Sequence, residues 1–314
     1  MLYGTGKFTY ELVNGWAKYP ESWGILGAPG LTVDSQDRLY VFSRGTHPIT
    51  VFDREGNLLT SWGEEGLFKR AHGIYAGPDG SIYCTDDTNH TVRKFTPDGK
   101  PLLTLGKEDQ PSDTGYKKLG RLADNAMTVT HAGAPFNRPT GVALSSSGEI
   151  YVSDGYGNCR VHKFASDGTL LFSWGEPGDG PGQFRCPHSV LVDTQERVWI
   201  ADRVNKRAQV FDTWGKFINQ IPANGDASVV WIDHEETVYI CGHNGVSIST
   251  VDGQLLAHID DQDTGKHPGL FVGHAMVVDS KGDIYIGQPI KGNPQRFDQT
   301  DPKIRVLQKW ARKK

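Results

Sequence analysis

Three features of the sequence predict an all-β protein that is built from one repeated unit. Short apolar strands alternate with polar turns, an aromatic residue recurs in the same register, and 38 glycines and 17 prolines supply turn residues. Units of about 40 residues with four short antiparallel strands are typical of propeller blades. Because the unit occurs six times, the sequence predicts a six-bladed β-propeller.

The core of each unit joins two strands through a turn that is rich in Asp and Gly, which accept the positive φ of tight hairpins. The six copies are GLTVDSQDRLYVFSR, GIYAGPDGSIYCTDD, GVALSSSGEIYVSDG, SVLVDTQERVWIADR, VVWIDHEETVYICGH and AMVVDSKGDIYIGQP. A third strand such as VRKF or VHKF follows, and after another turn comes a fourth strand such as LLTSWG or LLFSWG.

The blades are predicted in chain order at residues 29–63, 72–106, 139–175, 187–221, 227–259 and 273–310. The stretch FTYELVNGW near the N-terminus has the pattern of a fourth strand without a blade of its own. We expect it to complete the last blade and close the ring, which removes open sheet edges. This arrangement predicts a single domain over residues 1–314.

One insertion interrupts the regular spacing between the second and third blades. It covers residues 107–137, with the sequence KEDQPSDTGYKKLGRLADNAMTVTHAGAPFN. A loop of this length inside a compact fold is usually functional or mobile.

Composition excludes several functional classes. The formal net charge of −4 gives no basic footprint for nucleic acid, and no apolar run approaches a membrane span. The start MLYGTGKFTYELVNGW has no positive region followed by an apolar segment, so a cytoplasmic location is expected. The four scattered cysteines are then expected to be reduced, buried residues. The number of subunits is left open.

The aromatic in the second strand of each blade gives a fixed point for comparing the blades. Counting back eleven residues from these aromatics reaches, in order, Pro29, His72, Thr140, His188, Ser228 and His274. Histidine therefore occupies this position in every second blade. Alternate blades of a six-bladed ring lie about 120° apart, and the position precedes the innermost strand. We therefore expect three imidazoles to converge on the central channel.

Three histidines with an open fourth position are the ligand set of a catalytic zinc site. Imidazole also suits copper, iron, nickel and cobalt, so another divalent transition metal is the alternative to zinc.

Counting forward four residues from the same aromatics reaches Arg44 and Arg203 in the first and fourth blades, which face each other across the ring. Tyr156 lies one residue after the corresponding position of the third blade. Arginine can hold a carboxylate through two hydrogen bonds, so these residues predict a small anionic organic substrate. The alternative for both arginines is an ion pair between blades. Asp87 and His243, in the same series, are interpreted as structural residues.

Several stretches together carry a family resemblance over nearly the whole chain. They are SRGTHPITVFD, AHGIYAGPDGSIYCTD, RPTGVALSSSGEIYVSDGYGNCRV, PGQFRCPHSVLVDTQERVWIADRVNKRAQVF and GHAMVVDSKGDIYIG. The DGYGNCR and PGQF…PHS…ADR elements are specific, whereas the simple strand–turn–strand pattern is general. The sequence resembles the peptidyl-α-hydroxyglycine α-amidating lyases, which are six-bladed propellers of the NHL-repeat type.

The resemblance implies zinc bound by His72, His188 and His274, active-site arginines at Arg44 and Arg203, and a catalytic tyrosine at Tyr156. It also implies a structural calcium ion held partly by the main-chain carbonyls of Leu31 and Ile74. The family has an aspartate directly after the third histidine, and this chain has Ala275 there. The disulfide cysteines of the family are not reproduced.

The implied reaction splits R–CO–NH–CH(OH)–COO⁻ into an amide and glyoxylate. Zinc and arginine beside Tyr156 are expected to lower the pKa of its hydroxyl, which would act as general acid or base. Two alternatives stay open. One is a metal-dependent hydrolase of an ester, lactone or amide at the same site, and the other is a non-catalytic NHL interaction module.

Overall fold

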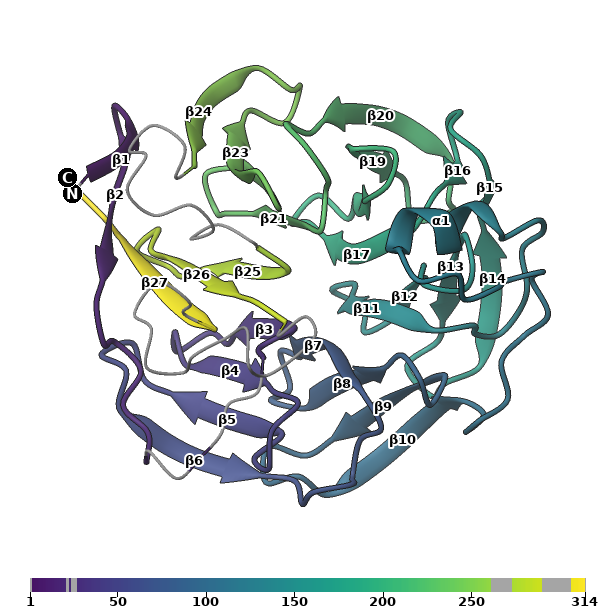
Figure 1. The fold of residues 1–314 in the computed structure, drawn as a ribbon, viewed down its shortest axis with the longest axis horizontal. Coiled ribbons are helices and arrows are strands. Elements are labelled where there is room, and N and C mark those ends of the chain that lie inside the picture. The colour runs from purple at the N-terminus through teal and green to yellow at the C-terminus, as the bar shows by residue number, and fades with distance from the viewer. Residues whose placement is uncertain (1, 21–22, 24–26, 261–272, 290–305, 314) are drawn as a thin grey trace.

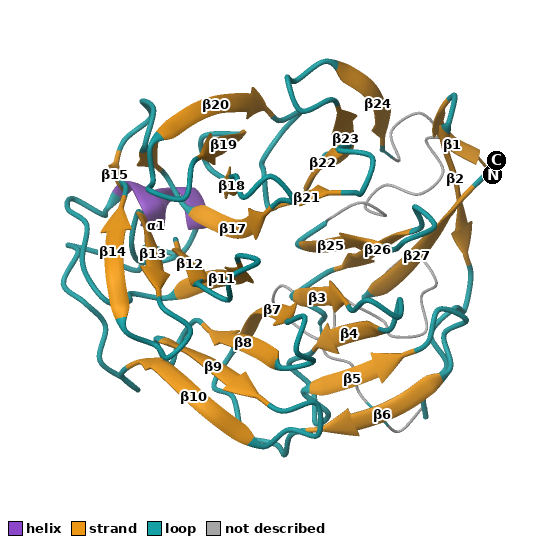
Figure 2. Cartoon of the chain, turned by 180° about the vertical axis from the view of Figure 1, so that it is seen from behind, coloured by secondary structure: helices purple, strands orange, loops and turns teal. Residues whose placement is uncertain are grey.

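The computed structural model describes residues 2–20, 23, 27–260, 273–289 and 306–313. Its strands form antiparallel sheets arranged as the blades of a ring around a central channel (Figure 1). The predicted six-bladed β-propeller is therefore confirmed. Strands make up nearly all of its regular structure, as the view from behind shows (Figure 2). No helix in the described part of the chain is long and apolar enough to span a membrane.

Each of the first three blades is a four-stranded sheet whose strands follow the chain outward from the channel. The first consists of β3 (Gly30–Val33), β4 (Leu39–Phe42), β5 (Ile49–Phe52) and β6 (Leu58–Trp62). The second consists of β7 (Ala71–Ala76), β8 (Ile82–Asp86), β9 (Thr91–Phe95) and β10 (Pro101–Gly106). The third consists of β11 (Pro139–Leu144), β12 (Ile150–Asp154), β13 (Arg160–Phe164) and β14 (Leu170–Trp174).

The next two blades repeat this order. The fourth consists of β17 (Pro187–Val192), β18 (Val198–Asp202), β19 (Arg207–Phe211) and β20 (Phe217–Pro222). The fifth consists of β21 (Val229–Ile232), β22 (Val238–Gly242), β23 (Gly245–Ser249) and β24 (Leu255–Ile259). A short parallel pair, β15 (Glu176–Pro177) and β16 (Gln183–Phe184), joins the third blade to the fourth.

The last blade joins the two ends of the chain, as the sequence predicted. It contains β25 (Ala275–Val278), β26 (Ile284–Gly287), β27 (Leu307–Arg312), β2 (Phe8–Val13) and β1 (Leu2–Thr5). The strand β2 pairs antiparallel with β27, so the N-terminal segment closes the ring. Residues 290–305 of the predicted blade at 273–310 lie outside the described residues.

An aspartate six residues before the core aromatic recurs in four of the six blades, and Gly77 and Ser145 take its place in the second and third blades. In the fourth blade, one oxygen of Asp193 accepts the backbone N–H groups of Gln195 and Arg197 and so closes the hairpin turn. Its other oxygen accepts the indole N–H of Trp199 at 2.8 Å. The equivalent aromatics of all six blades are buried, and they are Tyr40, Tyr83, Tyr151, Trp199, Tyr239 and Tyr285. One carboxylate therefore links the turn to the aromatic core.

The innermost strands form a closed ring of neighbours. In order around the channel, β3, β7, β11, β17, β21 and β25 each contact the next, and β25 contacts β3 (Figure 1). Residues at the start of these strands are therefore brought together on the channel, however far apart they are in sequence.

Candidate metal centre and its cavity

The three predicted histidines converge on the channel. His72 and His188 are the second residues of β7 and β17, and His274 directly precedes β25. All three are buried, and their ring centroids are 4.6 to 4.9 Å apart. One potential ligand atom from each lies within 4.8 Å of the other two. Among the described residues this is the group of three that could hold a metal ion.

The intervening blades fix the orientation of each imidazole. Nδ1 of His72 lies 2.6 Å from the carbonyl oxygen of Thr140, and Nδ1 of His188 lies 2.7 Å from that of Ser228. Nδ1 of His274 lies 3.0 Å from the carbonyl oxygen of Pro29. A carbonyl only accepts, so Nδ1 carries the proton and Nε2 keeps its lone pair. This outer hydrogen bond is the one that metal-binding histidines commonly make.

The lone pairs of the three Nε2 atoms outnumber the hydrogen-bond donors around them. The Tyr156 hydroxyl is 3.0 Å from Nε2 of both His188 and His274, but it has one proton to give. Arg203 Nη1 donates to Nε2 of His188 at 3.2 Å. Nε2 of His72 is buried and has no hydrogen-bond partner among the described residues. The lone pair of His72 Nε2 is therefore available to an electron-pair acceptor.

Burial sets the charge of the three imidazoles. It lowers the pKa of each of His72, His188 and His274 well below the usual value, because the cation is poorly solvated there. Nearby positive charge acts in the same direction, from Arg203 on His188 for example. Neutral imidazole is the form that binds a metal ion. Donor type, tautomer, charge and the unpaired Nε2 all fit a transition-metal ion.

Arg203 is held by an ion pair between blades. Its Nε donates to Asp226 at 2.9 Å, and Asp226 also accepts from the backbone N–H of His243 at 2.6 Å. Arg203 follows β18 and Asp226 precedes β21, so the pair joins the fourth and fifth blades. The ion pair between blades, which the sequence offered as the alternative role of Arg203, is thus present in the structure. Because Arg203 also donates to His188, the ion pair fixes a cation beside the centre.

Arg44 has no such ion pair among the described residues. It follows β4, and its Nε donates to the carbonyl oxygen of Ala71 at 3.1 Å. Its Nη2 is buried and has no hydrogen-bond partner in the described part of the chain. Burial, and after it the charge of Arg70, lower the pKa of Arg44 to about 10. A buried guanidinium with an unused N–H group is suited to an anionic ligand.

Tyr156 is positioned between the histidines and the insertion. Its backbone N–H donates to the carbonyl oxygen of Arg138, and its ring packs edge-on against His72 with centroids 4.7 Å apart. Ala126 of α1 (Leu122–Met127) and Cys186 belong to the same small cluster. Burial raises the pKa of Tyr156 to about 12, although Arg203 lowers it. Arg203 by itself therefore does not bring the pKa of Tyr156 below its usual value, and the fall expected from zinc and arginine together stays a prediction.

A cavity of about 660 Å³ opens above this centre. His274, Tyr156, Arg44 and Arg203 line it, and the insertion contributes residues that include Lys118, Arg121 and Asn125. Its size is that of a small-molecule site. The sequence thus predicted four residues that share one cavity.

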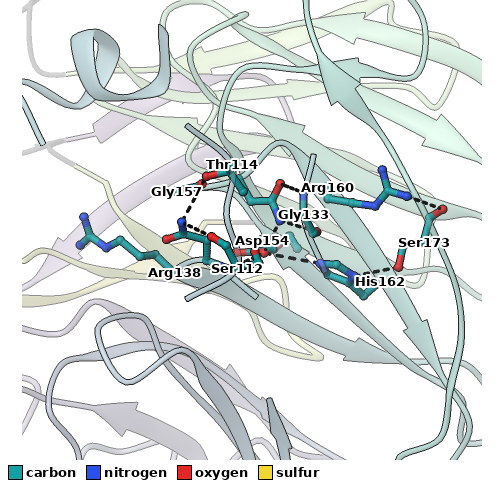
Figure 3. Close-up of polar contacts among 12 residues, drawn as sticks. Ser112, Thr114, Gly133, Arg138, Asp154, Gly157, Arg160, His162 and Ser173 are labelled. Carbon is teal, nitrogen blue, oxygen red and sulfur yellow. Dashed lines mark hydrogen bonds and ion pairs between the residues drawn. The ribbon is translucent and has the colours of Figure 1, made fainter. Parts of the chain in front are cut away.

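The insertion is anchored to the third blade by buried polar contacts (Figure 3). The Thr114 hydroxyl donates to the carbonyl oxygen of Gly157 at 2.6 Å, and Asn158 Nδ2 donates to the carbonyl oxygen of Gly133 at 2.8 Å. Asn137 Nδ2 donates to the carbonyl oxygen of Ser112 at 2.9 Å. The bonds to Gly157 and Asn158, one and two residues after Tyr156, hold the insertion beside the cavity, and the bond between Asn137 and Ser112 lies within the insertion.

The implied calcium site does not fit the residues present. Leu31 and Ile74 line the axial cavity on which the three histidines also border, together with Ala275. None of the described residues that line this cavity is Asp or Glu. Calcium takes six to eight oxygen ligands, usually with carboxylates among them. We therefore assign no calcium ion to this chain.

Sequence reasoning missed two arginines of the cavity, Arg70 and Arg138. The signal was available, because counting back thirteen residues from the aromatics of the second and third blades reaches these two positions. Only the folded ring shows that both arginines face the cavity.

Fold and site together define a six-bladed β-propeller with a buried three-histidine centre on its channel. The NHL repeat family matches residues 136–164. Human NHL repeat-containing protein 3 is 31% identical over 309 residues, which cover 90% of this chain and 82% of that protein. The chain therefore belongs to the family of NHL repeat-containing propellers.

The resemblance to amidating lyases is also confirmed. Peptidyl-alpha-hydroxyglycine alpha-amidating lyase 1 of Drosophila melanogaster is 33% identical over 168 residues, 50% of this chain and 27% of that protein. Mouse peptidyl-glycine alpha-amidating monooxygenase is 29% identical over 342 residues, 90% of this chain. The chain spans only 31% of the mouse protein's length.

A solved structure supports the fold alone. Virginiamycin B lyase from Staphylococcus aureus superposes with a TM-score of 0.58 at 13% identity, covering 90% of this chain and 82% of that chain.

Proposed function

We propose that this protein is a metal-dependent lyase that cleaves the C–N bond of a small N-acyl-α-hydroxyglycine, releasing an amide and glyoxylate. The observation that carries the proposal is the set of three buried, neutral imidazoles with an unpaired Nε2 on His72. The names of the Drosophila and mouse relatives support activity of the lyase type. His72, His188 and His274 would hold the metal, most simply zinc, which would polarise the substrate hydroxyl as a Lewis acid.

The other residues have roles that follow from their positions. In the reaction, the hydroxyl loses a proton, the C–N bond breaks as the aldehyde forms, and the nitrogen gains a proton. The Tyr156 hydroxyl, 3.0 Å from two Nε2 atoms, would take the proton from the substrate hydroxyl or give a proton to the leaving nitrogen. Arg44 would bind the substrate carboxylate through its unused N–H group. Arg203, fixed by Asp226, would stabilise the developing negative charge.

Metal content and glyoxylate release test the proposal together. The purified protein is expected to contain a divalent transition metal and to release glyoxylate from N-benzoyl-α-hydroxyglycine. His72→Ala should lower both to background, whereas His234→Ala, on an exposed turn, should change neither. A His72→Ala variant that keeps its metal and its turnover would contradict the proposal.

Product analysis separates the alternatives. Benzamide with glyoxylate supports the lyase. Benzoate would show that water added to the acyl carbon, which is the reaction of a hydrolase that uses the same three histidines. A protein that binds no metal and forms neither product would be a non-catalytic NHL interaction module.

A further inference from the structure

Two arginines above the histidine centre share one buried carboxylate. Arg70 Nη1 and Arg138 Nη2 each lie 2.6 Å from the same oxygen of Asp87. The Asp87 side chain is fully buried, and those of Arg70 and Arg138 are 35% and 15% exposed. One carboxylate neutralises one of the two guanidinium groups. The cluster therefore keeps an excess positive charge at the cavity wall.

These arginines flank the residue that we place at the reaction. Their guanidinium carbons lie 5.8 Å (Arg70) and 5.3 Å (Arg138) from the centroid of the Tyr156 ring. Arg138 is fixed further by a 2.7 Å hydrogen bond from its Nη1 to the Tyr116 hydroxyl of the insertion. Its φ of +66° is a conformation that L-residues other than Asn, Asp and His rarely adopt. The fold thus holds this side chain in place at a cost in backbone strain.

The cavity as a whole is lined by positive charge. Its cationic residues are Arg44, Arg70, Lys118, Arg121, Arg138 and Arg203. None of its described lining residues is Asp or Glu. Arg203 is neutralised by Asp226, but Arg44, Lys118 and Arg121 form no ion pair with a described carboxylate. A single substrate carboxylate at Arg44 would leave most of this charge unmatched.

We propose that Arg70 and Arg138, aligned by Asp87, form a second anion-binding subsite, with Lys118 and Arg121 of the insertion at its rim. This inference rests on the proposed function and narrows its substrate class. The preferred N-acyl-α-hydroxyglycine carries a second carboxylate on its acyl group. The α-carboxylate binds at Arg44, and the acyl carboxylate binds at Arg70 and Arg138. Asp87 is then a positioning residue.

Two uncleavable probes test the subsite by calorimetric titration at constant ionic strength. N-succinylglycine carries a carboxylate where N-butyrylglycine carries a methyl group, and neither has the α-hydroxyl that the reaction needs. The metal-loaded protein is expected to bind the succinyl compound at least about tenfold more tightly, because a paired arginine contact contributes a charge-assisted hydrogen bond. Equal affinity for the two probes, or no binding of either, would overturn the subsite.

Substitutions at the cavity wall test whether these arginines cause the difference in affinity between the two probes. Arg138→Gln and Arg70→Gln should bring the affinity ratio close to one, because they weaken N-succinylglycine binding more than N-butyrylglycine binding. Because Arg138 also anchors the insertion, the exposed Arg121→Gln provides a second variant that should reduce the ratio without affecting folding. Lys100→Gln, on an exposed outer turn, removes the same net charge and should keep the full ratio. Equal weakening of both probes by Arg138→Gln and no effect of Arg121→Gln would refute the assignment.

The binding assay is independent of catalysis. If the protein prefers the succinyl probe but releases no glyoxylate from any α-hydroxyglycine, the proposed function fails and the anion subsite stands. If glyoxylate is released equally well from the succinyl and butyryl substrates and the probes bind equally, the lyase stands and the subsite fails.

Discussion

Each histidine of the centre depends on one main-chain carbonyl from the next blade. Thr140, Ser228 and Pro29 supply these oxygens, and they are the residues at the histidine position in the other three blades. The bond to histidine uses only the backbone at these positions, although the Thr140 hydroxyl also donates to the carbonyl oxygen of Pro187 at 2.7 Å. This explains why three residues as different as Thr, Ser and Pro can alternate with histidine.

Substitution of Tyr156 by phenylalanine removes the hydroxyl and keeps the aromatic ring. Tyr156→Phe is expected to keep the metal and the fold but to lower kcat by about 10²- to 10⁴-fold, the usual contribution of a positioned acid or base. Turnover and metal content measured on the same preparation check this. Tyr19→Phe, at a tyrosine that is 38% exposed, is the control. Unchanged kcat in Tyr156→Phe would exclude a proton-transfer role.

Between elements, the turns that follow the second strands connect neighbouring blades. Asp226 accepts hydrogen bonds from Arg203 of the fourth blade and from His243 of the fifth. The sequence interpreted His243 as structural, and its contact with Asp226 agrees with that role. Burial by itself would raise the pKa of Asp226, but the His243 hydrogen bond and the Arg203 charge hold it well below its usual range.

The depressed pKa of Asp226 predicts a pH-dependent contribution to stability. Because the folded pKa is below the unfolded value of about 3.9, the contribution is complete above about pH 4 and is lost as the pH falls further. Asp226→Asn should lower the free energy of unfolding by about 1–3 kcal/mol at pH 7. The gap from wild type should narrow between about pH 4 and pH 2. Urea unfolding across this range measures it, and a constant gap would contradict the prediction.

One buried hydroxyl, that of Thr114, contributes to holding the insertion against the third blade. Thr114 donates to Gly157 and also accepts the amide N–H of Asn137 at 3.1 Å. Thr114→Val keeps the shape and should cost about 1–3 kcal/mol, since buried polar partners are left unpaired. Hydrogen exchange should quicken in residues 112–130 more than elsewhere. Thr213→Val on the β19–β20 turn is the control, and unchanged exchange in the insertion would show that Thr114 does not hold it.

On the scale of the whole molecule, the ring is closed by segments from opposite ends of the chain. Tyr10 of β2 is completely buried and belongs to one core cluster with Tyr239 of the fifth blade and Trp310 of β27. This cluster packs the last blade, in which His274 directly precedes β25, against the fifth blade. The position of His274 in the candidate metal centre therefore depends on contacts made far from the channel.

Removal of one buried side chain from the closing strand tests this dependence. Tyr10→Ala should lower the free energy of unfolding by about 3–5 kcal/mol, as large aromatic deletions in cores do. Leu2→Ala on β1, where Leu2 is 61% exposed, should cost less than about 0.5 kcal/mol. Urea unfolding of the two variants compares them. Equal losses would show that the closing strand does not stabilise the ring.

The sequence by itself determined the number of blades, the closing strand and the convergence of three histidines. These follow from periodicity, because a ring of equivalent units places equivalent residues at equivalent places. His72, His188 and His274 could be found by counting from one aromatic per blade. The same rule brought Arg44 and Arg203 to one cavity.

Only the tertiary structure decided which atoms of those residues are free. The Nδ1–carbonyl bonds, the unpaired Nη2 of Arg44 and the pairing of Arg70 and Arg138 with Asp87 depend on contacts between blades. The insertion breaks the repeat, so no counting rule could place Lys118 or Arg121 above the centre. Burial also raises the pKa of Tyr156 against the lowering by Arg203, and the sequence could not predict this because desolvation depends on how the molecule is packed.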